Sequence, residues 1–257
     1  MLKVQNVYKY FGGLKAVENC SFEVRPNFIT ALIGPNGAGK STVFNLISGI
    51  LQADSGRIFF NEQEITNQPP EKISNAGISR LFQQSRLFLN LTVKENLLLA
   101  LDNEDTKFWK NLAGVNKITN EKMERVREML RLMTLENFEN TFARDLSYGQ
   151  KRLVELARAI LNPHTFLMLD EPVAGVNPKL REVIANILLT LKTQKPSFVS
   201  NGTIEGKETI LLIEHDMRFT FSVADWVVVM QEGRVLFEGK PEEVKNNPKV
   251  LEAYLGD

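Results

Sequence analysis

The stretch GPNGAGKST, residues 34–42, decides how this chain folds. It lies between two apolar runs, FITALI at residues 28–33 and VFNLISGIL at residues 43–51. A short continuous apolar run is typical of a buried parallel strand, and we expect a helix to begin after the glycines, at Lys40. The stretch therefore predicts a strand, a glycine-rich turn and a helix in immediate succession.

The same stretch predicts a phosphate site, because it matches the pattern G-x-x-x-x-G-K-[ST]. Glycines allow consecutive backbone N–H groups to point at an anion, and the following helix adds the positive end of its dipole. Lys40 would supply charge to the β- and γ-phosphates, and the Ser41 hydroxyl is suited to bind Mg²⁺. The residues expected to bind nucleotide here are Gly34, Pro35, Asn36, Gly37, Ala38, Gly39, Lys40, Ser41 and Thr42.

A second part of this site is predicted in FLMLDEP, residues 166–172. Four apolar residues form a buried strand that ends at Asp170 and Glu171. An aspartate beside a phosphate-binding loop can hold Mg²⁺ through water, and a neighbouring glutamate can polarise an attacking water molecule. We therefore expect Asp170 to bind nucleotide through the metal and Glu171 to be catalytic.

A third element is LSYGQ, residues 146–150, which we call the signature segment; it opens the helix KRLVELARAIL. Ser147 and Gln150 fit a capping box, S-x-x-Q, which is a structural role. A cap needs neither Tyr148 nor Gly149, and a glycine at a helix N-terminus lets phosphate approach the backbone. One triphosphate needs one phosphate loop, so a second helix end of this kind in one chain requires an explanation.

The composition indicates a globular protein of ordinary charge. The 257 residues carry 31 basic and 31 acidic side chains, and this zero net charge argues against a nucleic-acid partner. The single cysteine, Cys20, excludes an internal disulfide and is expected to be a small buried apolar residue. No run of 18 apolar residues exists, so we expect any membrane role to depend on a partner.

The remaining pattern predicts a β-rich start, a mostly helical insert and a return to alternating strands and helices. Expected strands are LKVQNVYKYF (2–11), CSFEVRP (20–26), RIFF (57–60), TFLMLDEP (165–172) and TILLIEHD (209–216), with a hairpin turning at Glu232–Gly233. Expected helices occupy 97–135, interrupted by loops at 102–107 and Gly114, and 153–161. The polar stretch 195–207 is expected to be an exposed loop.

GPNGAGKST, LSYGQ, LMLDEP and IEHD, in this order, resemble the ATP-binding subunit of an ABC transporter, and the resemblance covers almost the whole chain. It implies an α/β fold: a P-loop NTPase (RecA-like) core with an N-terminal antiparallel β subdomain and an inserted α-helical subdomain. One domain would span 1–257, with its core at 1–83 and 161–257 and the helical subdomain at 84–160. In the family, the signature segment of one subunit caps the γ-phosphate bound by another, which explains two phosphate-binding helix ends.

Further roles follow from this resemblance, one residue at a time. Gln83 resembles the glutamine that touches Mg²⁺ and water and senses the membrane subunit, with Gln84 as a weaker candidate. His215 resembles the switch histidine at the γ-phosphate, whereas His164 lacks that context and is expected to be structural. The expected catalytic set is Glu171, His215, Gln83 and Lys40, the metal ligands are Ser41, Gln83 and Asp170, and the residues acting in trans are Ser147, Tyr148, Gly149 and Gln150.

Two positions leave alternatives open or depart from the family pattern. Phe11 resembles the aromatic residue that stacks on adenine, while Tyr8 and Tyr10 could instead be core residues of the strand. Asn177 stands where many members carry aspartate, so a charged contact across the dimer is in doubt there. The apolar stretch 85–96 fits both packing between lobes and docking of a membrane subunit.

Within the family, FGGLKAV, EPVAGVNP, LLIEHDM and the ending NNPKVLEAYLGD look most like the ATPases of branched-chain amino-acid uptake. The cofactors implied are ATP and Mg²⁺. The partners implied are a second ATP-binding subunit, a membrane permease and, indirectly, a solute-binding protein, with the chain in the cytoplasm on the inner face of the membrane. Alternatives are transport of lipopolysaccharide or another solute, and a soluble assembly ATPase of the iron–sulfur scaffold type.

Overall fold

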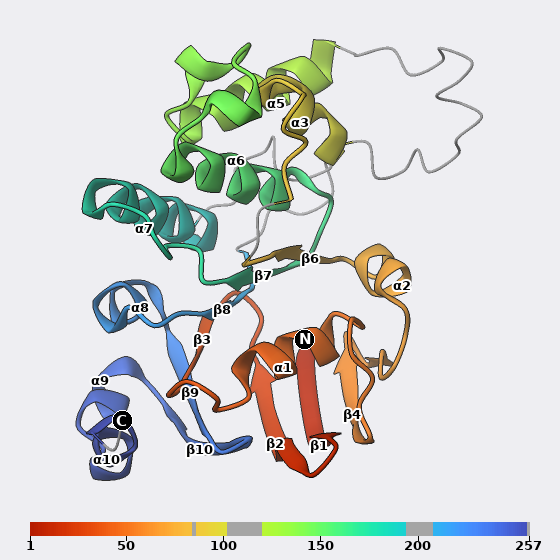
Figure 1. Cartoon of the computed structure of the whole chain (residues 1–257), viewed down its shortest axis with the longest axis vertical. Helices are drawn as coiled ribbons and strands as arrows, with labels where there is room; N and C mark the ends of the chain where they lie inside the picture. Colours follow the sequence, from red (N-terminus) through yellow and green to blue (C-terminus); the bar gives the residue numbers. More distant parts are fainter. Residues whose placement is uncertain (84–85, 102–119, 194–207, 256–257) are drawn as a thin grey trace.

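The computed structural model describes residues 1–83, 86–101, 120–193 and 208–255, and in it the chain forms two β-sheets and a helical region (Figure 1). The larger sheet has the strand order β10-β9-β3-β8-β7-β6. Its neighbouring strands are parallel except for β9 and β10, which form an antiparallel hairpin. The strands are β3 (Ile29–Ile33), β6 (Ile78–Leu81), β7 (Phe166–Asp170), β8 (Ile210–Ile213), β9 (Trp226–Gln231) and β10 (Arg234–Gly239).

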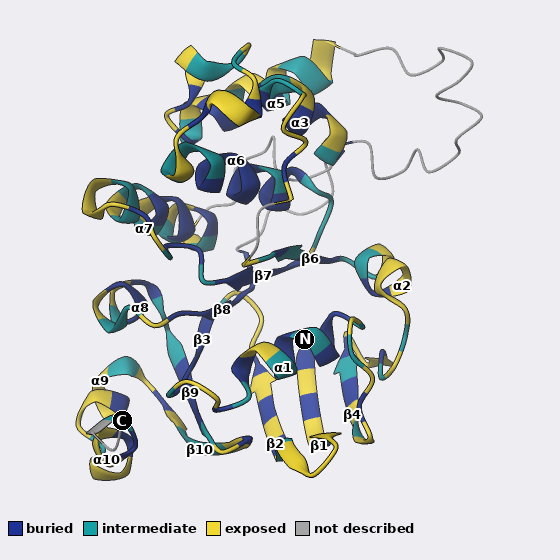
Figure 2. Cartoon of the chain, in the orientation of Figure 1, coloured by how far each residue is buried: buried dark blue, intermediate teal, exposed yellow. Residues whose placement is uncertain are grey.

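The smaller sheet is antiparallel and lies beside the first helix (Figure 1). Its strand order is β2-β1-β4-β5. Alternating buried and exposed residues along β1 show that one face packs inward and the other meets solvent (Figure 2). The strands are β1 (Leu2–Phe11), β2 (Leu14–Val24), β4 (Ser55–Phe60) and β5 (Gln63–Glu64).

The helices cover both faces of the larger sheet and form a separate group around α3, α5 and α6 (Figure 1). The α-helices are α1 (Lys40–Ile47), α2 (Pro70–Asn75), α3 (Val93–Leu101), α5 (Asn120–Leu132), α6 (Tyr148–Leu161), α7 (Pro178–Thr193), α8 (Met217–Val223), α9 (Pro241–Lys245) and α10 (Pro248–Leu255). Two short 3₁₀ turns, η1 (Glu136–Phe138) and η2 (Ala143–Asp145), lead into α6. Within the described residues, no helix combines the length and apolar character needed to cross a bilayer.

The larger sheet separates two hydrophobic cores, and this explains its continuous apolar strands. On β3, Ile29, Ala31 and Ile33 pack into the core shared with the helical region, while Leu32 packs on the opposite side with α1. A strand covered on both faces has no solvent-facing position and therefore shows no polar alternation. The fold class expected from the sequence is confirmed in both sheets and in the helical region.

Two strands differ from their predicted form. The second strand begins at Leu14 rather than near residue 20, because its first half, LKAVEN, pairs with β1 although its apolar and polar residues do not alternate regularly. Strand β6 was not predicted at all, since its four residues ISRL include a serine and an arginine that interrupt the apolar run. The predicted loop at 195–207, the loops at 102–107 and Gly114, and Gln84 lie outside the described residues.

Cys20 occupies the predicted buried position, with its side chain in the core between the smaller sheet and α1. Burial raises the pKa of its thiol to about 12, so almost no reactive thiolate exists at neutral pH. We expect the thiol of the native protein not to react with Ellman's reagent. In denaturant, one thiol per chain should react. Rapid reaction of the native protein would contradict this burial.

Candidate functional site

The phosphate loop, residues 34–42, leads from the end of β3 into the first residues of α1, as predicted, and its first glycine is required by the backbone. A Cβ atom on Gly34 would lie 2.1 Å from the carbonyl oxygen of Met230 on β9. The following lysine is buried: Lys40 Nζ donates to the carbonyl oxygens of Gly34 at 2.7 Å and Pro35 at 2.9 Å. Burial lowers the pKa of Lys40, and the charge of Glu171 partly opposes that shift. The ammonium group thus lies folded within its own loop.

A cavity of about 390 Å³ opens over this loop, large enough for part of a nucleotide. The loop contributes residues 36–42, and Phe11 and residues 14–16 of the antiparallel sheet form another wall. Gln83, Glu171 and His215 complete the lining, although they follow three different strands, β6, β7 and β8. The structure therefore gathers most of the sequence-predicted site residues around one space.

Within that cavity, Glu171 lies between the two other polar residues. Gln83 Nε2 donates to Glu171 Oε2 at 2.9 Å, and His215 Nε2 lies 2.9 Å from Glu171 Oε1. A carboxylate accepts hydrogen bonds, so this contact suits the His215 tautomer that carries its proton on Nε2. Parallel strands end at the same edge of the sheet, which is why residues 83, 171 and 215 meet.

Asp170 is buried behind this cavity and is held by Arg80, a residue that the sequence did not single out. Arg80 Nη2 lies 2.7 Å from Asp170 Oδ2, and both side chains are less than a tenth exposed. The other oxygen, Asp170 Oδ1, is buried and has no hydrogen-bond partner among the described residues. An unpartnered carboxylate oxygen suits a hard cation such as Mg²⁺, which takes few protein ligands and keeps water and phosphate, although Asp170 does not itself line the cavity that contains Ser41.

The Arg80–Asp170 pair gives a stability prediction. Replacing Arg80 with methionine leaves the Asp170 carboxylate buried without its counter-ion, so the free energy of unfolding should fall by about 3–5 kcal/mol. Urea denaturation measures the change. Arg57→Met, at an exposed position of β4, is the control and should shift stability by less than about 0.5 kcal/mol. Equal stabilities of the two variants would contradict the importance of the buried pair.

The signature segment forms the predicted capping box at the start of α6. Ser147 N donates to Gln150 Oε1 at 2.8 Å, and Gln150 N donates to Ser147 Oγ at 3.4 Å. Ser147 and Tyr148 are exposed, and none of the four residues 147–150 lines the cavity over the phosphate loop. A Cβ on Gly149 would lie 2.5 Å from Leu180 Cδ1 of α7, so a larger residue there would require the Leu180 side chain to shift. Action of these residues in trans stays a prediction.

The remaining predicted residues divide between the cavity and the scaffold. Phe11 is 46% exposed at the cavity wall, as a stacking residue would need to be. The side chain of His164 is buried, with Nε2 3.4 Å from Glu208 Oε1, which fits its expected structural role. Asn177 Oδ1 accepts from Leu180 N at 3.0 Å and so caps the first turn of α7.

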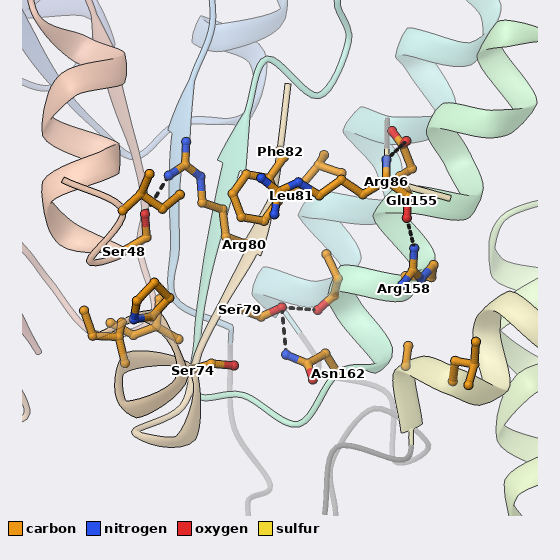
Figure 3. A pocket seen from close by; sticks show the side chains of 17 residues that line it. Ser48, Ser74, Ser79, Arg80, Leu81, Phe82, Arg86, Glu155, Arg158 and Asn162 are labelled. Atoms are coloured by element: carbon orange, nitrogen blue, oxygen red, sulfur yellow. Dashed lines mark hydrogen bonds between the residues drawn. The ribbon is translucent and has the colours of Figure 1, made fainter. Parts of the chain in front are cut away.

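A second cavity, of about 500 Å³, lies between the sheet and the helical region (Figure 3). We call it the interlobe groove; α2, β6 and the two residues Ser48 and Ile50 that follow α1 form one side, and α3 and α6 form the other. Within the apolar stretch after residue 85, Leu87 and Val93 are buried while Phe88 and Leu89 are about half exposed. Leu99 on the groove wall is also 48% exposed. The stretch therefore packs between lobes and also leaves an apolar surface uncovered.

Comparison with known proteins identifies the family behind this geometry. A sequence model described as "ABC transporter" matches residues 17–174. The chain belongs to the ABC transporter family. A second model, of a branched-chain amino acid ATP-binding cassette transporter, matches residues 234–257 of this ABC ATPase.

Curated relatives of the ABC ATPase match along its whole length. The probable branched-chain amino acid transport ATP-binding protein LivG of Archaeoglobus fulgidus is 38% identical, covering 100% of this chain and 95% of the relative. The high-affinity branched-chain amino acid transport ATP-binding protein BraF of Pseudomonas aeruginosa is 39% identical, covering 100% and 98%. The protein is thus an ATP-binding subunit most like those of branched-chain amino acid uptake, as its sequence suggested.

Solved structures agree in fold. A nucleotide-free ATP-binding cassette from an ABC transporter aligns with a TM-score of 0.82 at 35% identity, covering 100% of this chain and 99% of that one. The ADP conformation of an ATP-binding cassette aligns equally well, at 34% identity. A dimeric bacterial ABC transporter cassette aligns with a TM-score of 0.78 at 25% identity, covering 94% and 99%. ATP binding and pairing with a second ATPase subunit are therefore properties of this family.

Proposed function

We propose that this ABC ATPase binds Mg²⁺·ATP between two copies of its fold and drives a membrane permease for branched-chain amino acids. The observation that carries the proposal is the common cavity of the phosphate loop, Gln83, Glu171 and His215. Identity of 38–39% over the whole chain to branched-chain amino acid transport subunits supports the substrate class. We place the protein in the cytoplasm, on the inner face of the membrane, with a solute-binding protein as an indirect partner.

In the proposed reaction, each residue of the cavity has a separate task. The loop backbone and Lys40 hold the triphosphate, and Lys40 Nζ exchanges its two carbonyl partners for phosphate oxygens. Ser41, Gln83 and Asp170 would hold Mg²⁺, and the ion would supply positive charge to the phosphates. Glu171 accepts a proton from the attacking water, and His215 orients the γ-phosphate.

The contacts of Glu171 indicate how nucleotide binding prepares this site. Each carboxylate oxygen already accepts one hydrogen bond, Oε2 from Gln83 and Oε1 from His215, so these two residues compete with a water molecule for Glu171. We infer that ATP binding would draw His215 toward the γ-phosphate and release Gln83 from Glu171, which would leave the carboxylate free to accept a proton. The partner subunit's signature segment then closes the site, with residues 147–150 contacting the nucleotide and Phe11 stacking on adenine.

The interlobe groove is the part of the surface that we assign to the permease. It borders Phe82, the residue before Gln83, and Arg86 farther along the chain, so an occupant there would contact the segment that contains Gln83 (Figure 3). Exposed Phe88, Leu89 and Leu99 provide apolar area for a helix of the partner. We take 84–160 as the helical subdomain of a single domain 1–257, with 1–83 and 161–257 as its core.

The proposal is tested by measuring ATP hydrolysis by the purified protein and amino-acid uptake by cells. Purified protein should hydrolyse ATP without an added acceptor, and cells carrying only Lys40→Ala should take up less labelled leucine, isoleucine and valine. Glucose uptake in the same cells is the control and should not change. Unchanged amino-acid uptake with a defect for another solute would overturn the substrate class, whereas co-purification with no multispanning protein would favour a soluble assembly ATPase.

A further inference from the structure

Arg152, on the first turns of α6, is buried among the backbone carbonyls of the segment that carries Glu171. Its side chain is only 3% exposed. A guanidinium group has five N–H donors, and each of them has an acceptor here. Nε donates to Pro172 O (3.3 Å), Nη1 to Phe82 O (2.8 Å) and Glu155 Oε2 (3.0 Å), and Nη2 to Asp170 O (2.6 Å) and Glu171 O (2.8 Å).

The backbone at Glu171 needs support of this kind. Its φ is +50°, in the left-handed region that residues with a Cβ rarely adopt. The carbonyls of Asp170, Glu171 and Pro172 all point to the one side where Arg152 lies. A buried cation there compensates three clustered carbonyl dipoles, which would otherwise disfavour this turn.

Arg152 also connects Glu171 to two other segments of the molecule. Gln150 of the capping box lies two residues before Arg152, so the same helix begins at the signature segment. The ion-paired Glu155 accepts from Arg86 N at 3.1 Å on the edge of the interlobe groove (Figure 3). One guanidinium group thus joins the signature helix, the segment next to Gln83 and the strand end at Glu171.

We propose that Arg152 is a positioning residue for ATP hydrolysis: it holds Glu171 in the left-handed conformation that directs its carboxylate toward Gln83 and His215. Because α6 starts at the signature segment, Arg152 also makes the position of Glu171 depend on the helix that meets the partner's nucleotide. The inference rests on the proposed catalytic role of Glu171. It adds a link that runs inside one chain and connects the two nucleotide sites of a dimer.

The first test separates turnover from binding. In Arg152→Met, kcat should fall by about 100-fold, the typical effect of misplacing a catalytic group by about 1 Å, while the Kd for ATP stays within about threefold. Arg152→Lys keeps the charge but has three donors in place of five, so its kcat should lie between those of the wild type and Arg152→Met. Arg131→Met, an exposed arginine of α5, is the control.

The deciding test combines Arg152→Met with Glu171→Gln in single-turnover experiments. If Arg152 acts through Glu171, its substitution should cause no further loss once Glu171 has lost its function. The proposal would be overturned if the rate losses of the two substitutions multiplied in the double variant, or if both Arg152 variants kept the wild-type kcat. Failure of both Arg152 variants to fold would also overturn it and leave Arg152 a structural residue. Absence of ATP turnover in the wild type would instead contradict the proposed function itself.

Discussion

Replacing Glu171 with glutamine is expected to abolish ATP turnover while leaving ATP binding intact. Glutamine keeps the size of the side chain and a hydrogen-bond acceptor but cannot take a proton from water, and general-base catalysis contributes about 10²- to 10⁴-fold. The phosphate loop and Lys40 are unchanged, so the Kd for ATP should remain close to that of the wild type. Turnover is measured by phosphate release and binding by calorimetry.

The same variant should accumulate as an ATP-bound dimer. The closed pair is stabilised by contacts of two subunits with the γ-phosphate, and without hydrolysis these contacts persist. Size-exclusion chromatography with light scattering at saturating ATP measures the mass. Glu64→Gln, at an exposed position of β5, should show no such shift. A monomeric Glu171→Gln protein under these conditions would count against nucleotide held between two copies.

Replacing Lys40 with alanine is expected to act at an earlier stage, on nucleotide binding itself. A charged hydrogen bond to phosphate contributes about 1.5–3 kcal/mol, so the Kd for ATP should rise by about 10- to 100-fold. In the free protein Lys40 Nζ bonds to the carbonyls of Gly34 and Pro35, so the substitution also removes two contacts within the loop. Calorimetric titration with ATP measures the affinity.

Lys3→Ala is the matched control for that experiment, because Lys3 is about half exposed on β1 and pairs only loosely with Glu23, at 3.3 Å. Its ATP affinity should equal that of the wild type. The two active-site variants then differ in which property they lose. Glu171→Gln loses ATP turnover and keeps a normal affinity for ATP, whereas Lys40→Ala loses affinity for ATP. Tight ATP binding by Lys40→Ala would show that the ammonium group is not part of the phosphate site.

The sequence by itself determined the parts of this protein whose physical causes are local. The glycines and the lysine of 34–42, set between apolar runs, fix the strand, turn and helix, because φ freedom and hydrophobic periodicity act over a few residues. The carboxylates after residues 166–169 and the turn at Glu232–Gly233 follow from the same local rules. These patterns were sufficient to predict the phosphate loop and the two carboxylates, whereas the fold class and the roles of Phe11, Gln83 and His215 came from the resemblance to the family, and residues 14–16 of the cavity wall were not predicted.

Only the tertiary structure decided which distant groups meet. Arg152 reaches Phe82, 70 residues away, and Arg80 reaches Asp170, 90 residues away; in the sequence both look like ordinary charged residues. The pairing of Gln83 and His215 with Glu171 depends on the order of β6, β7 and β8 in the sheet. The N–H donors of a buried arginine must find acceptors within the protein, and for this reason Arg152 and Arg80 hold distant segments together. Burial is a property of the packed chain, so no short sequence pattern reveals it.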